Sequence, residues 1–511
     1  MLFINPAIDN ATQPKVVRKF TYACFPTSIG FLASYLRQHN KAEVRVLDEQ
    51  IVDLSSSILE SELSRLKYPK VVGIPNLTPT TKKVIQLTRQ IKKIDPKTII
   101  ILGGIHPTVL SEEVLENSSA DIAVRGEGEL TLSELYDCLK NERDYSGLKG
   151  ISFKSGSVIR HNSNRELISN LNDLPSLAYD LFEDNLSLYS DFGTIISSRG
   201  CPFDCIFCSQ RAISGHGYRF YSAARVLEEI KLLVDKYRQK KIWFVDDSIA
   251  TNKKRLYELL DAIKQSGYHK KVAFIGTARG NDLTYEMLER LKDCNFVSLA
   301  FGIETGSERL MKIINKRELV EDNIRAIKMC EKAGILADAS LIFGLPTETR
   351  KERYDTLKLM CRLPLDGARF NIAVPYPGTP LYRMAKEENR LHVHKDWANC
   401  CNQYYLEGND LPYVPKGNHG RVLIFDTMLA NLTFNLRPAT LYKMLFKSPL
   451  SGGGVLSLPK KWYISPSFLF SLIVFFYIIT KRLLCLSVKL VFLVLSGKSE
   501  ELRENSGIKD D

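Results

Sequence analysis

The sequence predicts an α/β protein that contains two successive series of parallel strands and ends in a helical C-terminal region. Short apolar runs alternate with amphipathic stretches in two parts of the chain, three closely spaced cysteines stand early in the second part, and the composition turns basic and strongly apolar near the end. The 511 residues are 44% hydrophobic and 25% charged, which is a globular composition. No apolar run of spanning length occurs before residue 462, so a polytopic membrane protein is excluded.

Residues 1–140 are expected to form a doubly wound parallel sheet, because each short apolar run is separated from the next by a helical pattern. The helical stretches include Ile29–Leu36 and Leu130–Leu139. Ligands bind such sheets at the carboxyl ends of the strands, where this chain carries polar and glycine-rich turns. The expected strands are Leu2–Ile4, Val44–Leu47, Val71–Ile74, Ile99–Leu102 and Ala123–Val124.

A polar connector is expected over residues 141–190, with a small hairpin over Lys154–Arg165. A second βα series follows over residues 191–390. Its six units are too few for a closed eight-stranded barrel and instead predict a partial (β/α)6 barrel, whose active face again lies at the carboxyl ends of the strands. The expected strands are Gly193–Ser197, Lys241–Val245, Val272–Gly276, Val297–Ile303, Ala339–Phe343 and Ala368–Val374.

Three cysteines, Cys201, Cys205 and Cys208, follow the first strand of the second series. The N-terminus shows no secretory signal, so reduced cytoplasmic thiols are expected. Thiolates in a reducing compartment bind zinc, copper or iron–sulfur clusters. A structural zinc site needs four ligands, and the loop offers no fourth cysteine or histidine. The spacing therefore favours an iron–sulfur cluster with one open iron over an incomplete zinc knuckle or unliganded surface cysteines.

The pattern Cys-x3-Cys-x2-Cys, with Phe207 before the last cysteine, resembles the signature of radical S-adenosylmethionine (SAM) enzymes. The resemblance implies a 4Fe–4S cluster on Cys201, Cys205 and Cys208. It also implies that SAM binds the fourth iron, where one electron from a donor such as flavodoxin or ferredoxin cleaves SAM to a 5′-deoxyadenosyl radical. That radical then takes a hydrogen atom from the substrate.

Three downstream segments resemble further motifs of this family. Phe244–Ser248 ends a strand where the family contacts the methionine amino group, Gly302–Gly306 resembles its Gly-Ile-Glu-Ser stretch, and Gly344–Glu348 resembles its Gly-Leu-Pro-Gly-Glu turn, each of the last two with one change. Taken singly, Asp246 could instead cap a helix and Glu304 could pair with a buried lysine. The SAM contacts that the resemblance implies are Phe207, Asp246, Asp247, Arg279, Glu304 and Gly344.

The first 140 residues resemble the Rossmann-like cobalamin-binding domain that precedes the radical core in one branch of the family. Gly103–Thr108 and Arg125–Glu129 carry this resemblance, and glycines there allow the backbone to approach a macrocycle closely. The cobalamin contacts that it implies are Asn5, Asp48, Thr78, Gly103, Gly104, His106, Gly126 and Glu127.

One feature departs from the cobalamin-binding pattern. Other corrinoid domains supply a lower cobalt ligand from an Asp-x-His-x-x-Gly turn, whereas Asp48–Asp53 has neither the histidine nor the glycine. We therefore expect the cobalt to lack a histidine from that turn. His106 is the other candidate ligand, although a histidine before proline in a turn is more often structural. A degenerate domain that no longer binds cobalamin stays open as an alternative.

The C-terminal region is divided into an accessory part over residues 391–455, a hydrophobic basic segment over 456–498 and an acidic, disordered tail over 499–511. Most of the net charge of +12 lies between Cys400 and Lys498, where 11 Lys and Arg stand against 3 Asp and Glu. Trp462–Thr480 is uncharged, and the basic residues that follow it fall on one helical face. This pattern favours a helix in the membrane interface over a single span or a soluble helical bundle.

These observations predict a cobalamin-dependent radical SAM enzyme at the inner face of the cytoplasmic membrane, without a nucleic-acid partner. Its expected reaction is methylation of an unactivated carbon in a lipid-like or other membrane-associated substrate. One alternative is an oxidative cyclase that resembles the anaerobic magnesium-protoporphyrin monomethyl ester cyclase. Another is a non-catalytic protein that binds an iron–sulfur cluster or a corrinoid.

Overall fold

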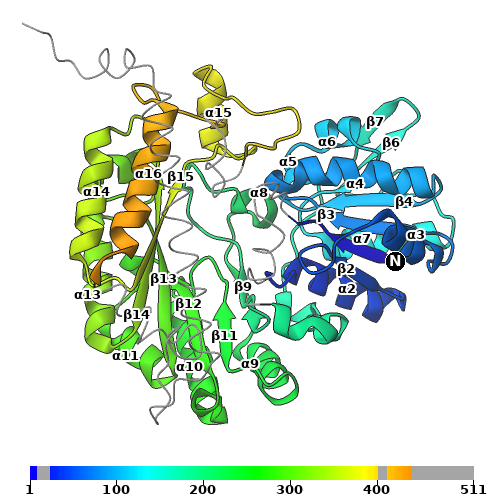
Figure 1. Cartoon of the computed structure of the whole chain (residues 1–511). Coiled ribbons are helices and arrows are strands. Elements are labelled where there is room, and N and C mark those ends of the chain that lie inside the picture. The colour runs from blue at the N-terminus through cyan, green and yellow to red at the C-terminus, as the bar shows by residue number, and fades with distance from the viewer. Residues whose placement is uncertain (8–22, 190, 401–410, 439–511) are drawn as a thin grey trace, which may run out of the picture. The chain divides into compact units, whose positions relative to one another are not determined.

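The computed structural model describes residues 1–7, 23–189, 191–400 and 411–438. Met1–Thr427 form one compact unit, and a second unit begins at Met428. Within the described residues the first unit contains a seven-stranded and a six-stranded sheet, coloured blue to cyan and green to yellow in Figure 1. The predicted α/β class is therefore confirmed, and the domain boundaries predicted inside this unit stay predictions.

The first sheet has the strand order β2-β1-β3-β4-β5-β6-β7, and its first five strands are parallel. Apolar side chains of β1, β3 and β4 pack on α3, α4 and α6 to form a buried core. The strands are β1 (Leu2–Asn5), β2 (Arg45–Asp48), β3 (Val71–Pro75), β4 (Ile99–Gly103), β5 (Ile122–Val124), β6 (Ile151–Ser155) and β7 (Val158–His161). The helices are α2 (Thr27–Asn40), α3 (Ser56–Ser64), α4 (Thr81–Ile94), α5 (Ile105–Val109), α6 (Ser111–Asn117) and α7 (Gly128–Lys140).

The hairpin predicted over Lys154–Arg165 forms as β6 and β7, but it belongs to the first sheet rather than to a separate connector. β6 pairs antiparallel with β5, with Ser152 opposite Ala123. Without this pairing, the buried strand β5 would leave its backbone amide and carbonyl groups unpaired at a sheet edge. The sheet therefore extends to His161.

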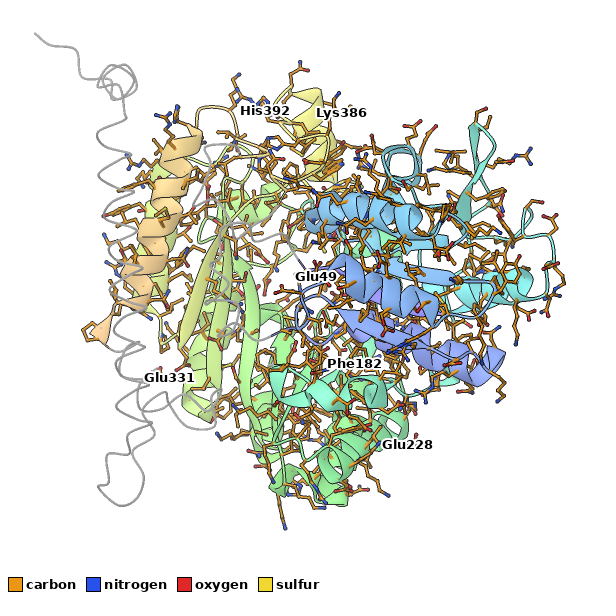
Figure 2. The ribbon with its side chains drawn as sticks, turned by 45° about the vertical axis from the view of Figure 1, so that its right-hand side comes forward. Glu49, Phe182, Glu228, Glu331, Lys386 and His392 are labelled. Carbon is orange, nitrogen blue, oxygen red and sulfur yellow. The ribbon has the colours of Figure 1, made fainter. Side chains whose placement is uncertain are left out.

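An aromatic cluster joins the start of the first sheet to the segment before the second. The ring of Phe25 lies 4.9 Å from that of Phe182, which is labelled in Figure 2, and 5.7 Å from that of Tyr189. The Tyr189 hydroxyl also donates a hydrogen bond of 3.0 Å to Asp48 at the end of β2. Such pairs contribute about 0.5–1.5 kcal/mol each beyond their buried area. The cluster fixes the chain that leads into the second sheet.

The second sheet is entirely parallel, in the order β15-β14-β13-β12-β11-β8, so all six predicted strands are confirmed. Side chains of Ser222, Asn252, Thr284 and Thr349 cap its helices. The strands are β8 (Thr194–Ile195), β11 (Lys241–Phe244), β12 (Ala273–Ala278), β13 (Phe296–Glu304), β14 (Leu336–Phe343) and β15 (Gly367–Ile372). The helices are α8 (Gln210–Ser214), α9 (Ala223–Lys231), α10 (Lys253–Ser266), α11 (Tyr285–Asp293), α12 (Glu308–Ile313), α13 (Val320–Ala333), α14 (Arg350–Arg362), α15 (Pro380–Glu387) and α16 (Gly420–Asn435).

The predicted membrane-associating segment, residues 456–498, lies outside the described residues, as do the predicted tail over 499–511 and residues 439–455 of the predicted accessory part. Among the helices that the structure describes, none combines the length and the apolar character needed to cross a bilayer.

Candidate active site

The three cysteines lie on one loop between the short strand β9 (Ser198–Arg199) and α8. Cys201, Cys205 and Cys208 line a single cavity of about 350 Å³, here called the cysteine cavity, together with Arg211 and Arg383. All three are free thiols. The three thiols line a cavity and do not converge on one position that a single metal ion could occupy. This arrangement fits a multi-iron cluster, in which separate irons each take one thiolate.

Burial raises the pKa of each of the three thiols, that of Cys208 to about 11. Thiolates therefore form here only when a metal compensates the desolvation of the charge. In the part of the chain that the structure describes, no group of three or more His, Cys, Asp and Glu side chains could hold a single metal ion.

The middle of the loop is anchored in the protein core. Ile206 packs against Met311 and Leu381, and its backbone N–H donates to the carbonyl of Ile314 at 3.1 Å. The Leu381 N–H in turn donates to the carbonyl of Ile206 at 2.9 Å. Phe207, a predicted SAM contact, packs at the edge of the same core cluster. The flanking Cys205 is therefore held by packing before any cofactor binds.

The adjacent carboxylates after β11 have separate environments. Asp246 is buried and accepts hydrogen bonds from the backbone amides of Ser197 at 2.7 Å and Ser198 at 2.9 Å. Its other oxygen accepts from the Ser197 hydroxyl. Asp247 instead lines the cavity of the first sheet described below, and burial together with the nearby Asp246 raises its pKa to about 6. Asp247 is thus the one free to meet a ligand.

Arg279 and Glu304 belong to a buried group of charges beside the cysteine loop. The Arg279 guanidinium lies 3.6 Å above the centre of the Phe203 ring, and Phe203 lines the cysteine cavity. Glu304, at φ +65°, pairs with Lys316 at 3.3 Å. The charges of Lys316 and Arg279 favour the thiolate form of Cys205. Sequence reasoning foresaw a buried lysine for Glu304 but not which one, because no motif marks Lys316.

The turn after β14 is fixed by a buried carboxylate. Gly344 has φ +80°, and its backbone N–H donates to Glu348 at 2.5 Å. Burial raises the pKa of Glu348 to about 7 although Arg353 lies 3.5 Å away. Gly344 is therefore held in a left-handed conformation that favours glycine.

A cavity of about 320 Å³, here called the sheet cavity, opens at the carboxyl ends of β3, β4 and β5. Glycines shape it: at Gly104, with φ +101°, a Cβ atom would lie 3.1 Å from the carbonyl oxygen of Asn76, and at Gly73 it would lie 2.7 Å from the Phe3 ring. Such a cradle of bare backbone fits a macrocycle and its side chains. The predicted cobalamin contacts that line it are Gly103, Gly104, Gly126 and Glu127.

The other four predicted cobalamin contacts do not line the sheet cavity. Asn5 donates a hydrogen bond of 3.0 Å to Asp48, whose pKa is raised by burial. His106 is fully buried, with Nδ1 3.3 Å from the Thr78 hydroxyl and its ring edge-on to Trp397 at 5.1 Å. Burial lowers the pKa of His106 to about 4, so the imidazole is neutral at pH 7. These four residues therefore contact other protein groups and do not line the cavity.

The two cavities are neighbours, separated by the short helix α8. Gln210, at its start, lines both cavities. Arg211 and Ala212 face the cysteine cavity, whereas Ile213 and Ser214 face the sheet cavity. A site for a cluster and a site for a macrocycle therefore share one wall, which sequence reasoning did not find because α8 carries no recognisable motif.

Comparisons with known proteins agree with this geometry. Residues 195–360 match the radical SAM superfamily and residues 14–136 match the B12 binding domain. An uncharacterised methyltransferase of Pyrococcus horikoshii is 33% identical over 429 residues, which cover 83% of this chain and 90% of that protein. The anaerobic magnesium-protoporphyrin IX monomethyl ester cyclase of Cereibacter sphaeroides is 25% identical over 373 residues, which cover 71% of this chain and 60% of the cyclase.

Among solved structures, the radical SAM methyltransferase TsrM from Kitasatospora setae, with cobalamin and a 4Fe–4S cluster bound, superposes with a TM-score of 0.68. The match covers 86% of this chain and 89% of TsrM at 16% identity, which shows a shared fold. The chain therefore belongs to the radical SAM enzymes that carry a B12-binding domain, and its cofactors are a 4Fe–4S cluster, SAM and cobalamin.

Proposed function

We propose that this enzyme transfers a methyl group from cobalamin to an unactivated carbon of a lipid-like or other membrane-associated substrate. The shared wall between the cysteine cavity and the sheet cavity is the observation that supports this most, because methyl transfer needs the radical and the methyl donor close together. When bound, the cluster and SAM supply a substrate radical, and cobalamin supplies the methyl group.

Residues on both sides of this wall would bind the cofactors and the substrate. Cys201, Cys205 and Cys208 would hold the cluster. Asp247 lines the sheet cavity but lies close enough to act electrostatically on Cys201 and Cys208, and it would accept hydrogen bonds from the SAM ammonium group. Apolar side chains such as Leu77, Ile213 and Val245 line the sheet cavity, and the exposed Leu77 and Val245 offer an apolar surface that a hydrocarbon substrate would cover. Apolar side chains at the opening of this cavity suit a substrate that is mostly hydrocarbon and that meets cobalamin there.

The relatives support methyl transfer but include a second chemistry. The Pyrococcus horikoshii relative is named a methyltransferase, and it matches 83% of this chain at 33% identity, against 71% at 25% for the cyclase. An oxidative ring closure, as in the Cereibacter sphaeroides cyclase, is the second candidate reaction.

A labelled turnover experiment separates the two reactions. The reconstituted enzyme is incubated without oxygen with SAM that carries a trideuterated methyl group, reduced flavodoxin as the proposed electron donor, and either membrane lipid extract or magnesium-protoporphyrin monomethyl ester. Methyl transfer gives 5′-deoxyadenosine and a lipid product that carries the trideuterated methyl group. A product that has lost hydrogen and carries no label would instead establish the cyclase reaction and contradict methyl transfer.

We also propose that residues 456–498 attach the enzyme to the inner face of the cytoplasmic membrane. The uncharged stretch Trp462–Thr480 is followed by Lys481, Arg482 and Lys489 on one helical face. An apolar face with a basic stripe binds the interface of an anionic bilayer. Attachment would give the enzyme access to a lipid substrate that need not pass through water.

A further inference from the structure

The cysteine loop is closed at its base by two short paired strands, each of which carries one arginine. β9 (Ser198–Arg199) pairs antiparallel with β10 (Arg219–Phe220), so that Arg199 stands directly opposite Arg219. We call these two arginines the loop stem. Next to this pair, a Cβ atom at Gly200 would lie 2.0 Å from the carbonyl oxygen of Gly217, so the two backbone segments of the loop pass very close to each other. The stem therefore sets the position of the whole loop.

Two carboxylates from the first sheet bind the loop stem. Glu127 accepts from Arg199 at 3.2 Å and from Arg219 at 2.9 Å, and Glu129 accepts from Arg199 at 2.5 Å. The four side chains are 5–13% exposed. Arg219 also donates to the carbonyls of Ile168 at 2.6 Å and Ser214 at 3.3 Å, so the same stem holds the end of α8.

The stem depends on these carboxylates for its charge balance. Two like charges directly opposite each other on paired strands repel. Burial alone would lower the pKa of Arg199, but Glu129 and Glu127 raise it overall, so the guanidinium stays charged. Two cations and two anions then balance inside the protein, and the loss of either carboxylate would leave a buried arginine uncompensated.

The same carboxylates flank the wall of the sheet cavity. Gly126 and Gly128, the immediate neighbours of Glu127, line that cavity, as do Glu127 and Glu129 themselves. A ligand that orders this turn also holds the carboxylates in the positions that the loop stem needs. A cluster that ties Cys201 and Cys208 to the already anchored Cys205 holds the arginines in the positions that the turn needs.

We propose that Arg199 and Arg219 are positioning residues through which cobalamin binding and cluster binding strengthen each other. Ordering of the turn by one cofactor reduces the conformational entropy that the other must remove. Because such coupling is reciprocal, the factor by which the cluster tightens cobalamin equals the factor by which cobalamin tightens the cluster. The inference rests on the two cofactors and not on the identity of the reaction.

The test measures the Kd of hydroxocobalamin for the full-length chain twice, once with the cluster reconstituted and once after a chelator has removed the iron. We expect the cluster to tighten binding by at least about fivefold in the natural protein. In Arg219→Gln the ratio of the two Kd values should fall close to one. Arg219 does not line the sheet cavity, so the change removes no direct contact with cobalamin.

Two further variants make the outcome specific. Glu134→Gln removes a carboxylate on α7 that pairs with Arg165 rather than with the stem, and should keep the natural ratio. Arg219→Lys keeps the charge without the forked geometry, should give an intermediate ratio, and carries the test if Arg219→Gln does not fold. A ratio near one in the natural protein, or an unchanged ratio in the Arg219 variants, would overturn the proposal. The product of turnover is not measured, so methyl transfer can fail without affecting this result.

Discussion

At the scale of single residues, Asp246 and Asp247 are adjacent in sequence but have different structural surroundings. Asp246 uses both of its oxygens on Ser197 and Ser198, whereas Asp247 faces the sheet cavity. Sequence motifs cannot separate such neighbours, because which carboxylate turns inward depends on the packing of β8 against β11. The motif does predict correctly that a carboxylate stands at this strand end.

This difference predicts opposite effects for the two amide variants. Asp247→Asn should raise the Kd of SAM about tenfold, since a charge-assisted hydrogen bond contributes roughly 1.5–3 kcal/mol, and should leave the thermal midpoint unchanged. Asp246→Asn should instead destabilise the protein by about 1–3 kcal/mol, because the remaining amide oxygen can accept from both backbone amides but the Ser197 hydroxyl loses its acceptor and the buried Arg255 loses its counter-charge. Equilibrium dialysis with SAM and thermal unfolding of the cluster-loaded protein measure both effects. Equal losses of SAM affinity in the two variants would contradict the assignment.

Glu348 predicts a specific dependence of stability on pH. Its pKa is about 7 in the folded protein, above the ordinary value of 4.5, because burial outweighs the Gly344 N–H and Arg353. Between these two values the folded state holds a proton that the unfolded state has lost, so stability falls as pH rises from about 4.5 to 7. The loss is on the order of 3 kcal/mol, and Glu348→Gln should abolish it.

The control for this prediction is Glu352→Gln, four residues further along the chain. The pKa of Glu352 is about 2, although burial opposes the shift, because Arg309 and the Thr349 amide stabilise its charged form. The stability that the charged Glu352 contributes to the folded protein is lost only as pH falls from about 4.5 toward 2. The Glu352→Gln variant should therefore be destabilised equally at pH 5 and pH 8. Thermal midpoints at those two pH values distinguish the variants. A Glu348→Gln protein that keeps the natural slope would refute the role given to this carboxylate.

At the scale of elements, the end of β4 allows the sheet cavity to be altered without altering the sheet. Gly103 lacks a left-handed φ, and a Cβ atom there would meet only the Val124 carbonyl oxygen at 3.9 Å. Gly103→Ala should therefore fold normally, yet its methyl group would occupy cavity space. Overpacking of this kind costs about 1–3 kcal/mol, so the Kd of cobalamin should rise roughly tenfold.

The matched control is Gly147→Ala, where a Cβ atom meets nothing within 4 Å. It should change neither cobalamin affinity nor stability by a measurable amount. Absorbance titrations with hydroxocobalamin give both Kd values. Unchanged affinity in Gly103→Ala would mean that the cofactor does not approach this part of the backbone.

The elements also show how far sequence reasoning reaches. All eleven parallel strands follow from apolar periodicity, because a strand between two helical patterns can only be buried in a parallel sheet. The hairpin β6–β7 was located but assigned to a connector, since local pattern does not reveal which edge a hairpin joins. The pairing of Glu127 with Arg199, 72 residues apart, left no local signal at all.

At the scale of the whole molecule, the membrane proposal predicts that attachment and cofactor binding can be separated. Truncation after Ser451 removes residues 456–498 but none of the residues that line either cavity. The truncated enzyme should retain its cluster and cobalamin and lose its binding to anionic liposomes. Burial of an apolar helix face contributes several kcal/mol at about 25 cal/mol per Å², and each nearby Lys or Arg about 1 kcal/mol.

Liposome sedimentation at low and high salt measures this binding. High salt alone should release little of the full-length enzyme, because the apolar contribution is not screened. A full-length protein that stays monomeric without detergent and ignores anionic liposomes would remove the basis for a membrane-associated substrate. It would leave the cofactor assignment unaffected.

The raised thiol pKa values of the cysteine loop have a consequence for survival in air. Dioxygen destroys iron–sulfur clusters that it can reach, and Cys208 is the most exposed of the three cysteines. Once iron is lost, however, a thiol with a pKa of about 11 is ionised in only roughly one molecule in ten thousand at pH 7. Since the thiolate is the form that oxidises, the raised pKa values of the three thiols slow sulfenic acid and disulfide formation in the emptied loop. Oxygen should therefore destroy the cluster but leave the three cysteines reduced, so that iron and sulfide alone restore the enzyme after exposure to oxygen.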